Sequence, residues 1–535
     1  MTLDLSDPAN RTLPTVLTTW ARATPDAIFL MSDEGQESFA ETERKVNRIA
    51  NGLRAFGVAR GDRVAILMGS RPDYVRIVLA VNRIGAIWVP INPDYRGDWL
   101  AEAIADSLPA ALIVEAAYAD RLAEVIDRVA VGRIAVLGPA GPLAGRVADF
   151  SEIAAASEAP PPPVAIDYGE TAAILWTSGT TGKPKGVMQS HNAWINSAES
   201  GNRAWETRPG DIAYNCLPLY NSAAWSATIL RALVAGIPVG MDPAFSVARF
   251  WDRIRHYGAT QTMSLGAMHM FLWNAPERPD DRDNPLRIAS MVPMPEHLID
   301  PFCARFGLEK ISQGFGQSEV MTLIGRDCRP GVRNKPNALG KVSDDFELRL
   351  VDDDGNEVPI GATGEFAVRA KKPHILFNGY FNNPEATAQA WRDGWFLMGD
   401  LGRRDEDGDY FFVDRKKDYI RYKGRSVSSF QVESVANRFP GIAQCAAYGV
   451  PSAELDSEHE IKLDVVPKPG EAIDPAMLAR FINDNAPHFI VPRYIEVVDA
   501  LPYTPTNKVE KYKLRAKGVT PGTWDRLAAA FELAR

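Results

Sequence analysis

A run of small, hydroxylated and basic residues is the part of this sequence best suited to chemistry. Residues 177–186 read Thr-Ser-Gly-Thr-Thr-Gly-Lys-Pro-Lys-Gly, with three glycines, four hydroxyl side chains and two lysines. Glycines let backbone N–H groups approach an anion closely, hydroxyls donate hydrogen bonds, and lysines add positive charge. The apolar residues 172–176 predict a buried strand that leads into the run, a usual place for nucleotide phosphates in α/β proteins. We therefore expect a phosphate-binding loop at 177–186.

The spacing within this loop distinguishes it from the common phosphoryl-transfer loop. That loop has four residues between its first glycine and a Gly-Lys-Ser/Thr sequence. Here two residues separate Gly179 from Gly182, and Pro184 follows Lys183. The alternative is a flexible surface loop, but such loops rarely have two lysines around a proline directly after a buried strand. The run therefore favours a phosphate-binding loop that serves a different reaction.

Three further segments have side chains that a nucleotide site needs. Residues 314–319 read Gly-Phe-Gly-Gln-Ser-Glu, in which the ring could stack on adenine and the carboxylate could bind phosphate-bound Mg²⁺. Asp400, at the end of the aromatic run 394–400, could accept hydrogen bonds from ribose hydroxyls. Lys508 follows the rigid segment 501–507. Each has an ordinary alternative, because the first could be any turn, an aspartate often caps a helix or turn, and a lone lysine is usually only solvated.

The composition is that of an ordinary soluble globular protein. The chain has 535 residues, more than one hydrophobic core usually supports, so we expect at least two domains. Apolar residues make up 46% and charged residues 24%, and the net charge of −9 offers no electrostatic footprint for nucleic acid or an anionic membrane. The four cysteines lie far apart, without the spacing of metal ligands or a disulfide framework. With no signal-type N-terminus and no transmembrane segment, we expect a cytoplasmic protein.

Alternating helix and strand patterns predict an α/β fold. Helical and strand patterns follow one another at 41–56, 63–68, 74–85 and 87–91. Such alternation is typical of a largely parallel, doubly wound sheet. From 340 to 369 two strand patterns surround an Asp-Asp-Asp-Gly turn, which predicts an antiparallel β subdomain. The end of the chain predicts a small α+β segment.

Taken together, these segments resemble the adenylate-forming superfamily, which includes acyl-CoA synthetases, adenylation domains of peptide synthetases and luciferase-type enzymes. The resemblance covers essentially the whole chain and is most specific at 177–186 and 394–424. Within the superfamily the sequence is most similar to bacterial acyl-CoA ligases of the crotonobetaine/carnitine-CoA ligase type, at 302–307, 324–331 and 410–415. The resemblance implies a large N-terminal domain of doubly wound mixed sheets with a β subdomain, followed by a small mobile α+β C-terminal domain.

The resemblance also implies a two-step ligase. A carboxylate attacks the α-phosphorus of MgATP, which gives an acyl-adenylate and pyrophosphate, and a thiol then displaces AMP. The implied cofactors and co-substrates are ATP, Mg²⁺ and coenzyme A, and the substrate is a small carboxylic acid. The implied catalytic residues are Lys508, Glu319 and Ser318, and the implied metal ligands are Glu319 and Thr177. Lys508 would bridge the carboxylate and the α-phosphate, where negative charge builds in the first transition state.

Most of the other residues that the resemblance assigns would contact the nucleotide or coenzyme A. Residues 177–185 would hold the β- and γ-phosphates, and Phe315 would stack on adenine. Asp400 would bind the ribose, with Arg415 close by on ribose or phosphate. The implied binding residues are Thr177, Ser178, Gly179, Thr180, Thr181, Gly182, Lys183, Lys185, Gly314, Phe315, Gly316, Gln317, Asp400, Phe412, Arg415, Lys423, Gly424 and Arg425.

Lys417 matches the family's hinge position, about which the C-terminal domain would pivot after adenylation. That motion would withdraw Lys508 and bring residues 422–425 to the thiol channel. The alternative is a surface charge in a basic run. The hinge gives the expected domains, which are an AMP-binding domain at 1–413, a hinge at 414–418 and a C-terminal lid domain at 419–535.

Three departures from the family's pattern concern the catalytic region. The family commonly has His after Pro-Leu-aromatic, whereas here Asn221 follows Tyr220. Residues 290–295, Ser-Met-Val-Pro-Met-Pro, replace a Gly-Ala/Gly-Gly element with bulkier side chains that would reshape the pocket. Residues 504–508 replace a Thr-x-x-Gly-Lys sequence, so the loop before the lysine lacks a glycine's freedom.

The sequence does not name the acid. The implied pocket residues are Tyr220, Asn221, Trp225 and Met291, with Met263, Met268, Met270 and Trp273 as further candidates that could equally be core. Methionine and tryptophan walls would suit an apolar or cyclic acid, although a tryptophan could also face a cation. The sequence contains no carrier domain, which favours free coenzyme A as the acceptor. The alternatives are an amine or a separate carrier protein as acceptor, or a non-catalytic acyl-adenylate-binding homologue, and a homodimer is a family-level expectation.

Overall fold

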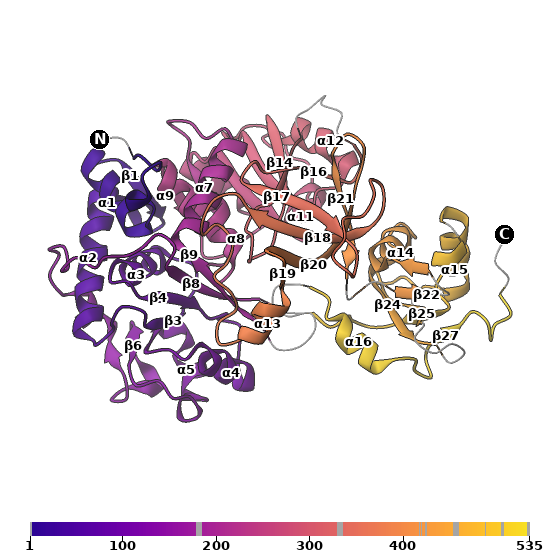
Figure 1. The fold of residues 1–535 in the computed structure, drawn as a ribbon, viewed down its shortest axis with the longest axis horizontal. Helices are drawn as coiled ribbons and strands as arrows, with labels where there is room; N and C mark the ends of the chain where they lie inside the picture. The colour runs from indigo at the N-terminus through magenta and orange to yellow at the C-terminus, as the bar shows by residue number, and fades with distance from the viewer. Residues whose placement is uncertain are drawn as a thin grey trace. The chain divides into compact units, whose positions relative to one another are not determined.

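The computed structural model describes residues 3–177, 184–328, 335–416, 418, 420–422, 425–452, 459–486, 488–503 and 508–531. They form two compact units (Figure 1). The first comprises the chain up to Thr177, Lys185–Glu347 and Ala370–Gln389. The second comprises Leu348–Arg369 and the chain from Ala390 onward.

The first unit contains two sheets, and the one that we call the mixed sheet has parallel strands in its middle and antiparallel strands at both edges. Its strands, in spatial order, are β2 (Gly35–Ser38), β1 (Ile28–Ser32), β11 (Val239–Met241), β10 (Ala213–Asn215), β12 (Gln261–Leu265), β13 (Ile288–Val292), β14 (Lys310–Phe315), β15 (Ile324–Cys328) and β16 (Ala338–Val342). The strands from β1 to β14 in this order pair in parallel, and β2, β15 and β16 pair antiparallel to their neighbours. The carboxyl ends of β12, β13 and β14 therefore meet at one edge, where α/β proteins usually bind ligands.

The other sheet of the first unit carries the predicted phosphate-binding loop. Its strands, in spatial order, are β7 (Ala148–Asp149), β6 (Ile134–Leu137), β5 (Ala111–Glu115), β3 (Arg63–Leu67), β4 (Ile87–Pro90), β8 (Thr171–Trp176) and β9 (Gly186–Ser190). All pair in parallel except β8 and β9, which form an antiparallel hairpin. The strand predicted at 172–176 is thus confirmed as β8.

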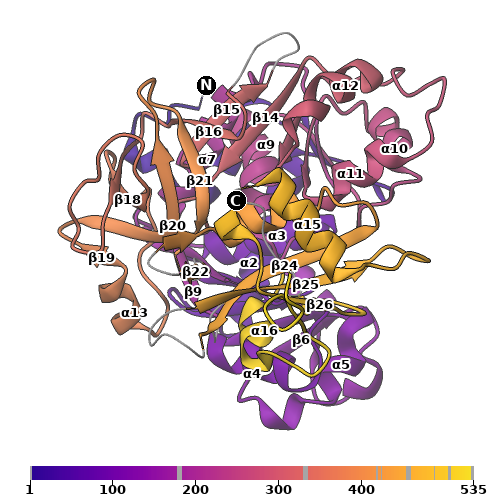
Figure 2. The same cartoon turned by 90° about the vertical axis from the view of Figure 1, so that its right-hand side faces the viewer.

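Helices cover both faces of each sheet, so the predicted doubly wound α/β fold is confirmed (Figures 1 and 2). The core shared by the two sheets receives side chains from α1 (Leu13–Ala23), α2 (Phe39–Ala55), α3 (Pro72–Arg83), α7 (His191–Ala204) and α9 (Leu230–Ala235). The outer face of the β8-containing sheet is covered by α4 (Gly97–Ser107) and α5 (Ala119–Ala123). The outer face of the mixed sheet is covered by α10 (Phe250–Tyr257), α11 (Ala267–Asn274) and α12 (Glu296–Phe306). Shorter helices are α6 (Phe150–Ala154), α8 (Ser222–Ala224) and α13 (Pro384–Gln389).

Helix α2 shows how the sequence sets these elements. Ser38 accepts a hydrogen bond from the Glu41 backbone N–H, and the Glu41 carboxylate accepts one from the Ser38 N–H, a capping box that begins the helix. Its apolar face packs into the shared core, and a Cβ at Gly52 would lie 2.1 Å from the Ile153 carbonyl oxygen. Only glycine therefore permits this approach of α2 to the end of α6.

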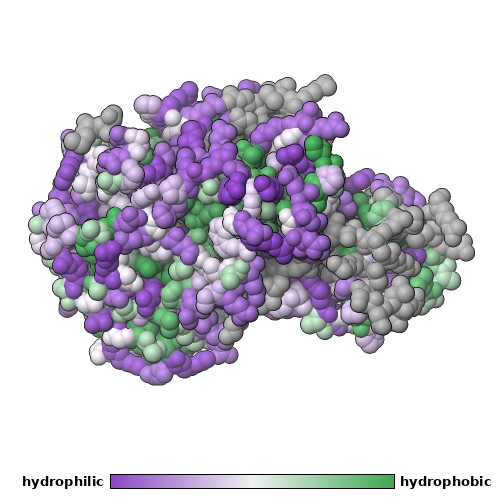
Figure 3. All heavy atoms as spheres, in the orientation of Figure 1, coloured by the Kyte–Doolittle hydropathy of each residue, from purple (hydrophilic) through white to green (hydrophobic). Residues whose placement is uncertain are grey.

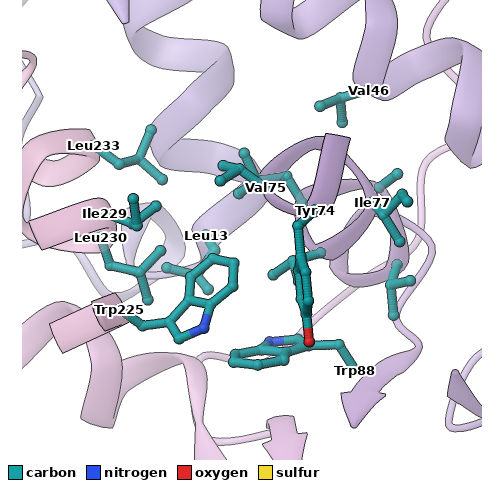
Figure 4. Close-up of a cluster of buried hydrophobic side chains, with 14 of the residues drawn as sticks. Leu13, Val46, Tyr74, Val75, Ile77, Trp88, Trp225, Ile229, Leu230 and Leu233 are labelled. Atoms are coloured by element: carbon teal, nitrogen blue, oxygen red, sulfur yellow. The ribbon is translucent and has the colours of Figure 1, made fainter. Parts of the chain in front are cut away.

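The centre of the shared core is aromatic. The rings of Trp88 and Trp225 lie 4.8 Å apart, and Tyr74 lies 5.9 Å from Trp225 (Figure 4). All three side chains are fully buried among aliphatic residues of α1, α3 and α9. Truncating one such ring to alanine typically costs about 3–5 kcal/mol, so this cluster joins the two sheets into one unit.

The second unit contains two separate sheets and a hairpin. Strands β17 (Phe346–Val351), β18 (Gly364–Ala370), β20 (Trp395–Arg404) and β21 (Tyr410–Arg415) lie in this spatial order, and β19 (Trp391–Arg392) pairs with β20. Strands β22 (Ile420–Tyr422) and β23 (Arg425–Val427) form the hairpin. The last sheet has the order β24 (Ile442–Pro451), β25 (His459–Pro467), β26 (Tyr494–Val497) and β27 (Trp524–Asp525). Its helices are α14 (Ser429–Ala436), α15 (Pro475–Asn485) and α16 (Lys511–Lys517).

Exposed apolar side chains are scattered over the described surface. Trp99, Phe271, Phe430 and Met477 each expose about half of their surface and come from four different helices. In Figure 3 hydrophilic residues are spread across the visible face, with smaller hydrophobic groups among them. Within the described ranges, no helix is both long and apolar enough to span a bilayer.

Because His191 is buried, we expect the folded protein to lose stability in mild acid. Burial lowers its pKa from 6.5 to about 4, and its ring faces the Leu13 N–H at 3.4 Å. Because the unfolded state binds a proton at higher pH than the folded state, stability is complete above pH 6.5 and falls as the pH drops towards 4. The loss is on the order of 3 kcal/mol. His191→Asn should flatten the pH dependence of the thermal unfolding midpoint across this window, and the exposed His256→Asn should not. Identical profiles for the wild type and His191→Asn would contradict this role.

Candidate active site

The phosphate-binding loop predicted at 177–186 closes the β8–β9 hairpin. The Thr177 N–H donates to the Lys185 carbonyl oxygen at 2.9 Å, and the Lys185 N–H donates to Thr177 Oγ1 at 3.4 Å. These bonds pin the two ends of the loop together. The predicted phosphate ligands Ser178, Gly179, Thr180, Thr181, Gly182 and Lys183 lie outside the described residues.

A buried tyrosine links this loop to the predicted metal ligand. The Lys185 ammonium lies 4.6 Å from the centroid of the Tyr380 ring, a cation–π contact. The Tyr380 hydroxyl donates to Glu319 Oε1 at 2.9 Å, and both side chains are buried. Burial, reinforced by the Glu319 carboxylate, raises the pKa of Tyr380 far above its ordinary value, so its proton remains on the hydroxyl. Lys185 and Glu319, which are far apart in the sequence, thus both contact Tyr380.

Tyr380 is a site residue that the sequence analysis missed. It forms a β-bridge with Val187, and the next residue, Phe381, donates its N–H to the Gly186 carbonyl oxygen at 2.7 Å. Segment 378–381 therefore lies along β9 at the loop's base. No local spacing pattern connects Tyr380 with Glu319, 61 positions earlier.

The segment Gly314–Glu319 leaves the carboxyl end of β14 and turns sharply. The Gln317 carbonyl oxygen accepts hydrogen bonds from the N–H groups of Val320 (3.1 Å) and Met321 (2.7 Å). Met321 has a φ of +62°, a region that bulky residues rarely adopt, and a Cβ at Gly316 would lie 1.6 Å from the Met321 carbonyl oxygen. The turn therefore needs glycine at 316. It leaves Phe315, Gln317 and Ser318 half-buried and Glu319 buried.

Among the residues expected to line the acid pocket, Tyr220 and Asn221 are half-buried at the start of α8. Asn221 caps this helix, because its Oδ1 accepts from the Ala223 N–H at 3.2 Å. Burial raises the pKa of Tyr220 to about 12. Asn221, which stands where the resembled superfamily commonly has histidine, thus caps the N-terminus of α8.

Trp225 and Met291 lie in the core. The Trp225 indole is fully buried and donates to the Leu219 carbonyl oxygen at 2.7 Å, and Met291 is 1% exposed among core residues of the mixed sheet. Trp225 also begins the π-helical segment η5 (Trp225–Ile229), a local widening that is frequent near functional sites. Met263, Met268, Met270 and Trp273 are each half-buried, on β12 and α11.

In the second unit, Asp400 and Arg415 face each other across an antiparallel pair. They are register partners on β20 and β21, and Arg415 Nε lies 3.8 Å from Asp400 Oδ1. Asp400 is 5% exposed, and Phe412 on the same strand as Arg415 is half-buried against the Phe430 ring. The structure therefore brings together the two residues expected at the ribose.

The chain around the predicted hinge is anchored on both sides. Lys416 Nζ lies 2.8 Å from carboxylate oxygens of Glu365 and Asp353, and Asp418 pairs with Arg515 of α16. Between these anchors, Lys417 lies outside the described residues, as do Lys423 and Gly424. The backbone of Arg425 pairs with Tyr422 in the β22–β23 hairpin.

Lys508 is exposed and lies shortly before α16. Tyr503 and Val509 form a β-bridge, and the Glu510 N–H donates to the Pro502 carbonyl oxygen at 2.8 Å. These contacts join the chain at Pro502 and Tyr503 to the chain at Val509 and Glu510, next to Lys508, and α16 follows directly.

The predicted Mg²⁺ site offers few protein ligands. Within the described part of the chain, no three His, Cys, Asp or Glu side chains cluster so as to hold a metal ion. Mg²⁺ is often bound by one or two carboxylates together with substrate phosphates. Glu319, buried beside the phosphate-binding loop, and the Thr177 hydroxyl fit that mode of binding.

Comparison with known proteins gives consistent matches along the chain. Residues 17–381 match the family described as AMP-binding enzyme, and residues 431–508 match the AMP-binding enzyme C-terminal domain. The chain is 30% identical over 502 residues to a Salmonella heidelberg protein named crotonobetaine/carnitine–CoA ligase, over 91% of this chain and 95% of that protein.

Two solved structures are similar over nearly their full length. Against ATP-bound MatB from Rhodopseudomonas palustris the TM-score is 0.82 at 27% identity, over 94% of this chain and 98% of that chain. Against the amide bond synthetase McbA from Marinactinospora thermotolerans the TM-score is 0.79 at 26% identity, over 94% of this chain and 99% of that chain.

Proposed function

The chain belongs to the family of AMP-binding enzymes, and from this premise we propose that it is an ATP-dependent acid–thiol ligase. It activates a carboxylic acid as acyl-AMP with release of pyrophosphate, and then transfers the acyl group to coenzyme A with release of AMP. The contact chain Lys185–Tyr380–Glu319 supports this proposal most directly. It joins a phosphate-binding loop to a buried carboxylate, as binding of MgATP requires.

The first half-reaction depends on positioning and charge. The 177–185 loop holds the β- and γ-phosphates, Ser318 contacts the α-phosphate, and Lys508 stabilises the charge that builds as the carboxylate attacks in line. Glu319 and Thr177 would hold Mg²⁺, which would neutralise phosphate charge when bound.

Further residues would hold the adenine and the ribose of the nucleotide. Phe315 stacks on adenine beside Gly314, Gly316 and Gln317, and Asp400 accepts hydrogen bonds from the ribose, with Arg415 close by on ribose or phosphate. After adenylation the C-terminal domain pivots about Lys417, and residues 423–425 then approach coenzyme A.

The half-buried methionines on β12 and α11 support an acid with an apolar or cyclic body. Met263 and Met268 are partly buried and pack against the shared core, so they would offer apolar surface to such an acid. Pyrophosphate release across a panel of short, long, aromatic and polycyclic acids, each at equal concentration, tests this choice. A preference for a charged, short acid would contradict it.

A second candidate function uses an amine as the acyl acceptor. The similarity to an amide bond synthetase, at 26% identity, supports this second candidate. The rate of AMP release with the preferred acid, measured with and without coenzyme A, separates the two. Coenzyme A should accelerate AMP release and yield a thioester. Turnover that needs an amine and ignores coenzyme A would establish the alternative.

Tyr380→Phe should weaken the metal site. Removing the hydroxyl leaves Glu319 Oε1 without this donor, and loss of such a partner typically costs about 10- to 100-fold in metal affinity or activity. We expect an approximately 10-fold rise in the Mg²⁺ concentration needed for half-maximal pyrophosphate release. Tyr214→Phe is the matched control, because the buried Tyr214 hydroxyl also donates to a carboxylate, that of Asp242, at 2.8 Å. An unchanged Mg²⁺ requirement in Tyr380→Phe would show that the tyrosine only stabilises the fold.

A further inference from the structure

A buried histidine connects two strand ends next to the proposed nucleotide site. His269 lies in the first turn of α11 and has no exposed surface. Its Nδ1 lies 3.0 Å from the Ser264 hydroxyl on β12, and its Nε2 lies 2.8 Å from the Pro293 carbonyl oxygen, directly after β13. One imidazole therefore spans β12, α11 and the segment 292–295 that follows β13.

The chemistry of the partners fixes the proton positions on this ring. A carbonyl oxygen can only accept a hydrogen bond, so Nε2 carries the hydrogen and donates it to Pro293. In the neutral ring Nδ1 then accepts from the Ser264 hydroxyl. Burial lowers the pKa of His269, which agrees with a neutral imidazole.

The segment 292–295 has two further anchors on neighbouring strands. The Gly266 N–H donates to the Val292 carbonyl oxygen at 2.9 Å, at the end of β12. The Met294 N–H donates to Gln313 Oε1 at 3.2 Å, and Gln313 directly precedes Gly314 on β14. The segment is thus fixed between the ends of β12 and β14, and the next residues on β14 are those proposed to contact adenine.

We propose that His269 is a positioning residue that clamps segment 292–295 for binding of the acid substrate. This inference rests on the proposed function. The carboxyl ends of parallel strands form the ligand-binding edge of an α/β sheet. With the adenine-contacting residues at the end of β14, the neighbouring ends of β13 and β12 are where the acid must lie to reach the α-phosphate. The Nε2–Pro293 hydrogen bond sets the position of the backbone at that edge.

Two substitutions separate the clamp from general packing. In His269→Gln the side-chain amide can place an N–H near the Nε2 position and still donate to Pro293. In His269→Asn the shorter side chain can reach Ser264 but not Pro293. Ser264→Ala, which keeps the imidazole, is a second probe, and the exposed His256→Asn is the control for histidine replacement as such.

The first readout needs no substrate. Amide hydrogen exchange at Met294 and Gly266, whose N–H groups anchor this region, should be about 10-fold faster in His269→Asn and near the wild-type rate in His269→Gln. Ser264→Ala should have an intermediate rate, because its imidazole loses one partner but keeps Pro293. Unchanged exchange in His269→Asn, or equal acceleration in Asn and Gln variants, would overturn the clamp.

The second readout is kinetic. The KM for the acid in pyrophosphate release should rise about 10-fold in His269→Asn, with the KM for ATP changed less than about twofold, and the Gln variant should restore it. A purely structural role would move both KM values together and would overturn the proposal. If no acid supports pyrophosphate release in the wild type, the proposed function fails, and the exchange measurement still decides the clamp by itself.

Discussion

Replacing Lys508 with alanine is expected to slow acyl-AMP formation by about 10²- to 10³-fold, because the transition state loses the cation that stabilises charge on the carboxylate and α-phosphate. Lys508 suits this role because its side chain is exposed and it directly precedes Val509, which is held in a β-bridge with Tyr503. The measurement is acid-dependent exchange of labelled pyrophosphate into ATP, which reports the first half-reaction alone. Transfer from preformed acyl-AMP to coenzyme A should change by less than about threefold.

The matched control is Lys513→Ala. Lys513 lies in the first turn of α16, is about half exposed and donates to Glu510 Oε2 at 2.5 Å, so its removal tests the loss of a nearby positive charge without the proposed contact. Its rates should stay within about twofold of wild type, as expected for an exposed ion pair. If Lys508→Ala lowered both half-reactions equally, the lysine would act on the conformation of the domain. An unchanged first half-reaction would refute the assigned mechanism.

Much of the fold could be predicted because local patterns and tertiary packing agree. The apolar stripe at 41–56 became α2, and the runs at 63–68 and 87–91 became β3 and β4, each within about two residues. The turn predicted between strands in 340–369 separates β17 from β18. In these segments the period of the apolar residues matches the face that the core buries. The domain boundary at 413 stays a prediction.

The candidate site was less predictable because its contacts join distant segments. The types of Thr177, Glu319 and Asp400 suggested their chemistry, but nothing local indicated that Tyr380 contacts Glu319 or that His269 contacts Pro293. The hydrophobic core and the walls of a pocket are also built from the same types of apolar residue. The sequence could not tell Trp225, fully buried on η5, from the half-buried Met263 on β12, because periodicity gives a face but not what lies opposite it.

Replacing Glu319, whose carboxylate accepts the hydrogen bond from Tyr380, is the second substitution with a large expected effect. Glu319→Gln keeps the size of the side chain and an oxygen acceptor for Tyr380 but removes the charge that Mg²⁺ requires. We expect pyrophosphate release to fall by about 10²- to 10³-fold at saturating ATP, with a much weaker response to added Mg²⁺. Glu460→Gln is the control, because Glu460 is equally buried but pairs with Arg493 in the second unit.

The double variant Glu319→Gln/Tyr380→Phe tests whether the tyrosine acts through the glutamate. If it does, Tyr380→Phe should cost about 10-fold in the wild-type background but less than about twofold once Glu319 has lost its charge, since the metal ligand that it orients is already missing. Additive losses would mean that Tyr380 acts by another route, for example through its contact with Lys185. Lys185→Gln in the same cycle distinguishes that route, because it removes the cation over the ring and leaves the hydroxyl in place.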